Sequence, residues 1–307
     1  MTAPRPPRQP IEELRYALAE AEAHQPPVAL RARVLEAVHL ARPAGAHVAA
    51  GPAIGPGEAY RRTMVSFDSV LAELTDPEWQ VHVLRDLDIQ GLVGHLIGVE
   101  RQFHSALGIG PPITISTDHV ASTQADALAQ AGRTPAATHA EWRELLDATV
   151  TSTAGLDRAA LERPITLHGF TVSVERMLVV RSFECWTHEE DIRRATGRPL
   201  AAPDPARLRL MTELAVSALP TGLGYIDRPQ PGRTARLVLT GPGGGTWQAS
   251  LDRTQPGPTD VRIVADAASF CRLVANRLSP DALAADITGD AALAGAVLAG
   301  AQALALD

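Results

Sequence analysis

The sequence has little of what nucleic acid binding, secretion or membrane insertion requires. Its net charge is −7 and it contains no lysine, so it offers no basic stripe to a nucleic acid backbone or an anionic membrane. Its two cysteines, Cys185 and Cys271, lie far apart without a CxxC pair, which argues against a disulfide framework and indicates a reducing compartment. No apolar run reaches membrane-spanning length, and residues 1–10 lack the apolar core of a signal peptide. We therefore expect a cytoplasmic protein that binds neither nucleic acid nor membrane.

The N-terminal part of the chain differs from the rest in amino-acid composition. Residues 1–10 are rich in Pro and Arg, and amphipathic helical patterns at 11–24 and 28–41 precede a linker rich in Gly, Ala and Pro. We expect residues 1–55 to form a helical extension, which packs on the rest of the protein or joins two copies into a homodimer.

The chain of 307 residues is long enough for about two domains, and the expected fold class is α+β. Residues 56–202 read as helices almost throughout, which predicts a four-helix bundle with one short extended segment, RPITLHGFTVS. Residues 203–307 begin with a helix and continue with strand patterns and further helices, which predicts a small α+β domain. Helices are expected at 57–74, 88–107, 123–131, 135–154, from 173 onward and at 205–219.

The most informative segment is ECWTHEEDIRRATGRP, residues 184–199, which reads as the end of a long helix. Glu184 and His188 stand four residues apart and therefore share one helix face, which is otherwise apolar. A carboxylate and an imidazole on such a face need a partner that satisfies them, and a metal ion is the obvious one. Gly197 and Pro199 mark the end of the helix.

A third candidate ligand, His95, lies on the apolar face of the helix expected at 88–107. Taken alone, such a histidine is more often a core residue that is hydrogen-bonded to the backbone. A bundle, however, places the inward residues of neighbouring helices opposite each other, so His95 can meet Glu184 and His188. Two imidazoles and one carboxylate make the ligand set of a catalytic Zn²⁺ or similar divalent ion, with positions left for water or substrate.

Several neighbouring residues have two interpretations. Asp191 and Arg181 share the face of Glu184, where each either orients a ligand or forms an intrahelical ion pair. Cys185 points away from that face and is expected to pack. His168 lies in the loop before the long helix, where a solvated histidine is the commoner interpretation than one at the mouth of a site. The other histidines, His119 among them, show no informative spacing.

Two motifs together resemble a known family. The helix with GLVGHLIGVERQ, followed by ECWTHEEDIRRATGRP, is similar to the mycothiol-dependent maleylpyruvate isomerases, a branch of the DinB-like metalloenzymes. The resemblance implies a DinB-like bundle holding a divalent metal, normally zinc, through residues that match His95, Glu184 and His188 here. It also implies that the α+β region after Pro203 is related to sterol carrier folds. The resemblance extends over residues 56–305.

The resemblance also implies a chemistry. A divalent cation deprotonates a bound thiol, here mycothiol, and the thiolate then adds to an electrophilic small molecule. The outcome is isomerisation when the thiol leaves again and an S-conjugate when it stays. Anionic substrate groups need arginine donors, for which Arg277 matches a family position and Arg181 is a second candidate. Arg277 also has a plain interpretation as a helix-end charge that complements the helix dipole.

Two other functions remain open at this point. The protein can be a non-catalytic binder of a metal or small ligand, with the C-terminal region as a hydrophobic carrier, or a helical scaffold without metal. An open metal site facing a cleft favours an enzyme, whereas a closed site with four protein ligands favours a structural role.

Overall fold

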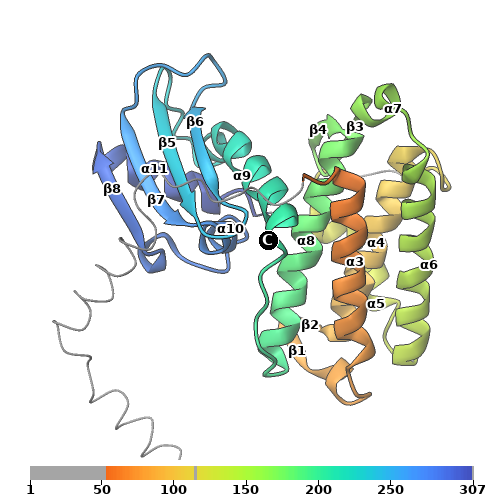
Figure 1. Ribbon diagram of the computed structural model, residues 1–307. Helices are drawn as coiled ribbons and strands as arrows, with labels where there is room; N and C mark the ends of the chain where they lie inside the picture. The colour runs from red at the N-terminus through yellow and green to blue at the C-terminus, as the bar shows by residue number, and fades with distance from the viewer. Residues whose placement is uncertain (1–52, 114–115, 306–307) are drawn as a thin grey trace, which may run out of the picture. The chain divides into compact units, whose positions relative to one another are not determined.

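Four long helices pack side by side in the part of the chain that the computed structural model describes, residues 53–113 and 116–305 (Figure 1). They are α3 (Pro56–Ala72), α4 (Ile89–Leu107), α6 (Pro135–Ala154) and α8 (Val174–Ala195), and the shorter α5 (His119–Leu128) and α7 (Arg158–Glu162) accompany them. Their inward side chains form one apolar core, which includes Phe67, Leu92, Leu96, Trp142 and Leu178. The predicted helix bundle is confirmed.

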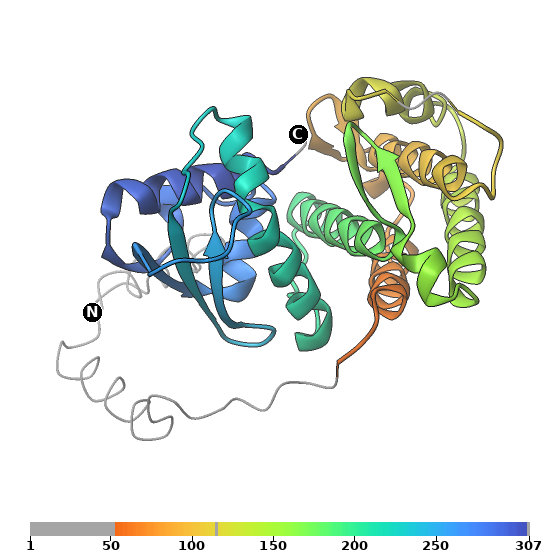
Figure 2. The same cartoon turned by 90° about the horizontal axis from the view of Figure 1, so that it is seen from above.

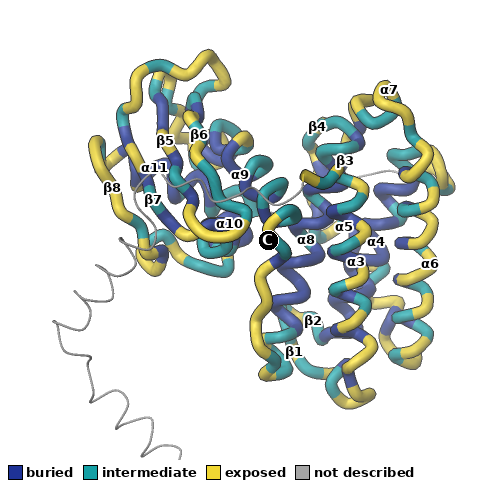
Figure 3. The backbone as a smooth tube through the Cα atoms, viewed as in Figure 1, coloured by how far each residue is buried: buried dark blue, intermediate teal, exposed yellow. Residues whose placement is uncertain are grey.

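Helix α8 is buried along most of its length, as the tube in Figure 3 shows. It begins where the Ser173 side chain accepts a hydrogen bond from the backbone N–H of Arg176. Gly197 takes the left-handed conformation with φ of 68°, and the N–H groups of Gly197 and Arg198 close the last turn on the carbonyls of Arg194 and Arg193. The helix end predicted at Gly197 is confirmed.

Two small hairpins flank the bundle. The first, β1 (His82–Leu84) and β2 (Leu87–Asp88), follows the 3₁₀ helix η1 (Glu78–Gln80) and was not expected. The second, β3 (Pro164–Leu167) and β4 (Phe170–Ser173), confirms the predicted extended segment. His168 and Gly169 form its two-residue turn with φ of 50° and 81°, the left-handed values that a tight hairpin turn requires.

The C-terminal region builds a four-stranded sheet in the order β6-β5-β7-β8, with β5 and β7 parallel and the other pairs antiparallel. Burial alternates along β7, where Val261, Ile263 and Ala265 are buried, so one face of the sheet carries the core. The strands are β5 (Thr234–Thr240), β6 (Gly245–Ser250), β7 (Val261–Asp266) and β8 (Ala285–Gly289). The core is completed by α9 (Pro205–Tyr225), α10 (Ala267–Val274) and α11 (Ala291–Gln302), with the 3₁₀ helix η2 (Pro280–Ala282) before β8 (Figure 2).

Helix α9 continues beyond its predicted end at Leu219 and runs through Pro220 to Tyr225. Proline in a helix interior removes one backbone hydrogen bond and disfavours such a continuation. The packing of α9 on α11 outweighs that loss: a Cβ atom on Gly222 would lie 2.0 Å from the carbonyl oxygen of Gly300, so the two backbones touch. The extra turn carries Thr221 and Tyr225 to the cavity described below.

The α+β class, with a helix bundle followed by a small α+β region, is confirmed. The domain division between 202 and 203 stays a prediction, because all described residues fall within one contact unit. The helices expected at 11–24 and 28–41, and any homodimer contact they make, lie outside the described residues. Among the described helices, none is long and apolar enough to cross a membrane.

Candidate metal site and cavity

A hydrogen bond fixes the His95 ring so that one of its nitrogens is available to coordinate a metal. His95 is 2% exposed on α4, and its Nδ1 lies 2.7 Å from the Thr123 hydroxyl of α5. That hydroxyl donates its own proton to the backbone carbonyls of His119 and Val120, so its oxygen accepts from Nδ1–H. Nε2 then carries a lone pair, and it has no hydrogen-bond partner among the described residues. Burial lowers the pKa of His95 to about 4, so its imidazole is neutral at pH 7.

Glu184 presents an ionised oxygen to the same space. Burial by itself would raise the pKa of Glu184, but the Arg181 guanidinium and the nearby His119 and His95 rings hold it well below its usual range. Oε2 accepts a hydrogen bond from Arg181 Nη1, whereas Oε1 is buried without a hydrogen bond from any described residue. Oε1 lies 3.5 Å from Nε2 of both His95 and His119.

His119 is the residue that the sequence interpretation missed. It opens α5, which starts four residues before the predicted 123, and it is buried with Nδ1 unpartnered among the described atoms. Ligand atoms of His95, His119 and Glu184 all lie within 4.8 Å of one another. No spacing signal exists for this contact because it depends on α5 packing against α4. The Asp118 side chain, which caps α5, is the one local clue to the helix start.

His188 lies one turn beyond Glu184 and lines the same cavity. Its ring centre is 5.8 Å from that of His95, and its Nδ1 lies 3.1 Å from Asp191 Oδ2. Arg277 in turn donates to both Asp191 oxygens at 2.7 Å, from Nε and Nη2. Burial would raise the Asp191 pKa, but these bonds lower it to about 2. Arg277 and Asp191 thus hold the His188 ring beside the cluster of His95, His119 and Glu184, but His188 is not one of the three residues whose ligand atoms lie within 4.8 Å of one another.

Arg181 forms ion pairs with two carboxylates inside the protein, while its Nε has no hydrogen-bond partner among the described residues. Its side chain is 1% exposed, and besides Glu184 it donates to Glu100 Oε2 at 3.0 Å. Glu100 also accepts a hydrogen bond from Tyr60 at 2.7 Å. Between the two interpretations left open for Arg181, the contact with Glu184 supports orientation of a candidate ligand and is an intrahelical pair as well.

His168 is not a solvated loop histidine, so that expectation was wrong. The hairpin turn carries it inward, where it is 6% exposed and neither ring nitrogen has a hydrogen-bond partner in the described chain. Its ring centre lies 4.3 Å from that of His119. Burial and the neighbouring His119 lower the pKa of His168 to about 4. Cys185, in contrast, packs as expected: it is buried, and burial raises its thiol pKa.

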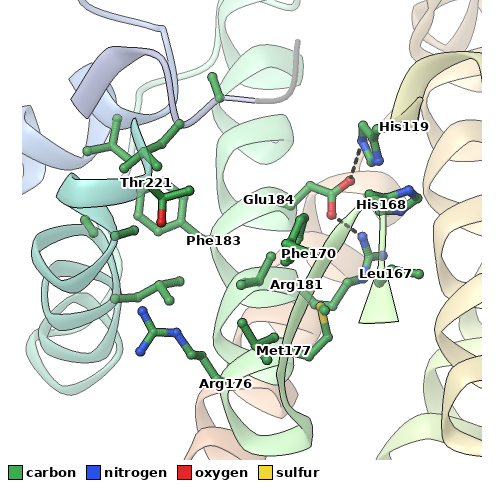
Figure 4. Close-up of a pocket in the computed structure, with 18 of the residues that line it drawn as sticks. His119, Leu167, His168, Phe170, Arg176, Met177, Arg181, Phe183, Glu184 and Thr221 are labelled. Atoms are coloured by element: carbon green, nitrogen blue, oxygen red, sulfur yellow. Dashed lines mark hydrogen bonds and ion pairs between the residues drawn. The ribbon is translucent and has the colours of Figure 1, made fainter. Parts of the chain in front are cut away.

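A cavity of about 760 Å³ is lined by His119, His168, Arg181, Glu184 and His188. Figure 4 shows His119 and His168 beside Glu184 and Arg181, with Phe170 and Met177 next along the wall. Imidazole nitrogens and a carboxylate oxygen that converge without partners fit a divalent cation, whose ligands are of these types. The cavity gives a small molecule access to that point.

Known proteins show the same architecture. Residues 60–193 match the family model described as the mycothiol maleylpyruvate isomerase N-terminal domain. Two solved structures are similar to the chain: a mycothiol-dependent maleylpyruvate isomerase, at 16% identity and a TM-score of 0.50, and a point mutant of such an isomerase, at 15% and 0.53. Each similarity covers 75% of this chain and 91% of the other, and at these identities it concerns the fold. No curated protein matches the chain.

Proposed function

We propose, from the premise that the chain belongs through residues 60–193 to the mycothiol maleylpyruvate isomerase family, that it is a metal-dependent enzyme acting through a small thiol. One observation carries the metal. The lone pair of His95 Nε2 and the ionised Glu184 Oε1 face each other at 3.5 Å, and both atoms are buried without a hydrogen bond to any described residue. Two electron-rich atoms repel at that distance unless a cation lies between them.

The proposed ligands are His95, Glu184 and His188. Asp191 supports this set, because a carboxylate on Nδ1 leaves Nε2 of His188 to coordinate and fixes the orientation of the ring. Arg181 holds Glu184 in the same way, from the other carboxylate oxygen. In this arrangement His119 and His168 face the open positions, where a thiol and its reaction partner bind. Zinc is the metal we propose for this donor set.

A divalent cation bound there would deprotonate a coordinated thiol at neutral pH. Such a thiolate would supply a nucleophile that adds reversibly to the electrophilic carbon of a conjugated double bond, with the displaced π electrons accepted by the conjugated carbonyl oxygen. Rotation and loss of the same thiolate by cleavage of the carbon–sulfur bond would then give the other geometry, with no net gain or loss of a proton. Addition of a proton to carbon before cleavage would leave the S-conjugate instead.

The chain's own residues serve this sequence in two ways. His168 is neutral at pH 7, so an N–H of its ring can donate a hydrogen bond to the oxygen on which charge develops. The apolar walls exclude water from the adduct. We propose mycothiol as the thiol, maleylpyruvate as the first electrophile to test, and the cytoplasm as the location, in line with two free, buried cysteines.

The test is isomerisation of maleylpyruvate by the zinc-loaded protein with mycothiol. Glu184→Gln removes the anionic oxygen but keeps the shape, and we expect its rate to fall about 100-fold or more because the metal is lost. Glu162→Gln on the exposed pair with Arg158 is the control and should keep the full rate. A Glu184→Gln variant with normal activity would remove the mechanism.

A second candidate function, non-catalytic metal binding, is favoured by the position of His119. If His119 coordinates together with His95, Glu184 and His188, four protein ligands close the site. The zinc affinities of two histidine variants distinguish the enzyme from a non-catalytic metal-binding protein. The enzyme proposal expects His188→Ala to lose about 100-fold or more in zinc affinity and His119→Ala less than about threefold. Equal losses in both variants would favour the closed site.

A further inference from the structure

Three arginines line the cavity, and two of them have no carboxylate partner among the described residues. Arg181 is paired with Glu184 and Glu100. Arg176, half-buried on α8, and Arg253, exposed in the turn after β6, donate only to hydroxyl groups. Two guanidinium groups that face one cavity without a carboxylate partner can bind an anion together.

The two hydroxyls hold these guanidinium groups near each other. Arg176 Nη2 donates to Ser217 Oγ, and Arg253 Nη2 donates to Thr221 Oγ1 at 2.6 Å. Ser217 and Thr221 stand four residues apart on α9, so their side chains lie on one helix face. Burial and the positive charge of Arg253 both lower the pKa of Arg176, as expected for two neighbouring cations without a shared anion.

This pair lies far along the cavity from the candidate metal site. Arg176 and Glu184 are eight residues apart on α8, which is about 12 Å along the helix axis. Figure 4 shows Arg176 at one side of the cavity and His119 and His168 at the other. Apolar side chains also line the cavity, among them Phe170, Met177, Val180, Leu214 and Ala218.

We propose that Arg176 and Arg253 form an anion subsite for the carboxylate end of an elongated apolar substrate, whose reactive end lies at Glu184 and His188. A planar guanidinium suits a carboxylate because two parallel N–H groups match its two oxygens. The assignment of the reactive end rests on the proposed function, whereas the carboxylate subsite does not require the metal. A substrate that reaches both points carries its acidic group about 12 Å from the reacting carbon. Such a substrate is a medium-chain or aryl-substituted acid, longer and more apolar than maleylpyruvate.

Calorimetric binding of decanoate and of decan-1-ol to the full-length, zinc-loaded protein tests the subsite. We expect Arg176→Gln and Arg253→Gln each to weaken decanoate about tenfold, since each removes a charged hydrogen-bond donor, and to change decan-1-ol less than about twofold. Arg176→Lys keeps the positive charge but loses the two parallel N–H donors, so its decanoate affinity should lie between those of the unaltered protein and Arg176→Gln. Arg262→Gln removes an exposed charge from β7 outside the cavity and should change neither ligand.

Equal losses for the acid and the alcohol, or no loss in either glutamine variant, would overturn the subsite. Melting curves of each variant show whether a loss comes from misfolding. The distance between the anion subsite and the candidate metal site is tested on the cobalt-loaded protein. There, ω-mercaptoundecanoate should give the cobalt–thiolate absorption band at a lower concentration than the mercapto-alcohol of the same chain length. Failure of every thiol to give that band, with the decanoate result intact, would refute the proposed function and leave the subsite standing.

Discussion

At the scale of single residues, each proposed metal ligand has a neighbouring side chain that orients it. His95 is oriented by Thr123, Glu184 by Arg181, and His188 by Asp191. Such contacts fix which atom of each side chain remains available to a ligand, and they commonly decide metal affinity. Because Asp191 is itself held by Arg277, its carboxylate cannot turn away from His188 without breaking an ion pair.

Asp191→Asn should therefore weaken zinc binding about 10- to 100-fold, because the amide is uncharged and supports the His188 ring less well. Competition with a chromophoric chelator measures the affinity. Glu189→Gln is the matched control: it lies two residues away on the same helix, is also buried and pairs with Arg193, which forms no ion pair with Asp191 in the described chain. If the two variants lose the same affinity, Asp191 acts through general stability and not through His188.

Two buried histidines also predict how the metal-free protein responds to acid. The pKa of His95 and of His168 is about 4 in the folded chain, below the ordinary value of 6.5. The unfolded chain then binds more protons below pH 6.5, so stability is present above that pH and is lost as pH falls towards 4. The loss is about 2 to 3 kcal/mol per imidazole.

Urea unfolding of the metal-free protein between pH 7 and pH 4 measures this loss. His168→Asn should flatten the pH dependence, and asparagine tolerates the left-handed backbone at this turn. An unchanged pH profile in His168→Asn would mean that the buried imidazole does not cause the acid sensitivity.

The sequence predicted these residues unevenly. Glu184 and His188 followed from helical spacing, and the packing of Cys185 from its direction on the helix. His119 and His168 did not follow, because one opens a short helix and the other occupies a hairpin turn, and neither lies on a periodic face. Their burial depends on contacts between segments far apart in sequence, which local patterns do not encode.

At the scale of elements, helices were predicted best. The boundaries of α3, α4, α6 and α8 came within a few residues of those expected, because Pro, Gly and capping side chains mark helix ends locally. Two helices departed from expectation. Helix α5 starts four residues before its predicted start, and the continuation of α9 through Pro220 depends on packing against α11. That packing brings Ser217 and Thr221 to the cavity and so shapes the proposed anion subsite.

Gly222→Ala tests the close approach of α9 and α11. A Cβ there would lie 2.0 Å from the carbonyl oxygen of Gly300, so the helices must separate, and we expect a loss of about 2 to 4 kcal/mol. Gly224→Ala is the control on the same helix, because nothing lies within 4 Å of its added Cβ. Thermal unfolding that gives equal stability for the two variants would show that the contact does not constrain α9.

At the scale of the whole molecule, the sequence predicted the α+β class and the order of its two regions, because helical and strand periodicities change sharply after residue 203. It did not predict the ties between those regions. Arg272 with Glu190 and Arg277 with Asp191 join α10 and the turn after it to α8 over more than eighty residues of sequence. Charge pairing at such separation has no local signal.

These ties predict that the metal stabilises more than the bundle. Removal of zinc by a chelator should lower the melting temperature of the whole described unit, in one transition. When zinc is added back, the melting temperature should rise with the zinc concentration. Differential scanning calorimetry with and without zinc measures it. Two separate transitions, of which only one responds to zinc, would show that the regions unfold independently.

The proposed function requires an open metal site that takes a thiol. X-ray absorption at the zinc edge, on zinc-loaded protein before and after addition of mycothiol, distinguishes an open site from a closed one. We expect nitrogen and oxygen ligands alone before addition and one sulfur at about 2.3 Å afterwards. A spectrum with four nitrogen or oxygen ligands that is unchanged by the thiol would contradict it.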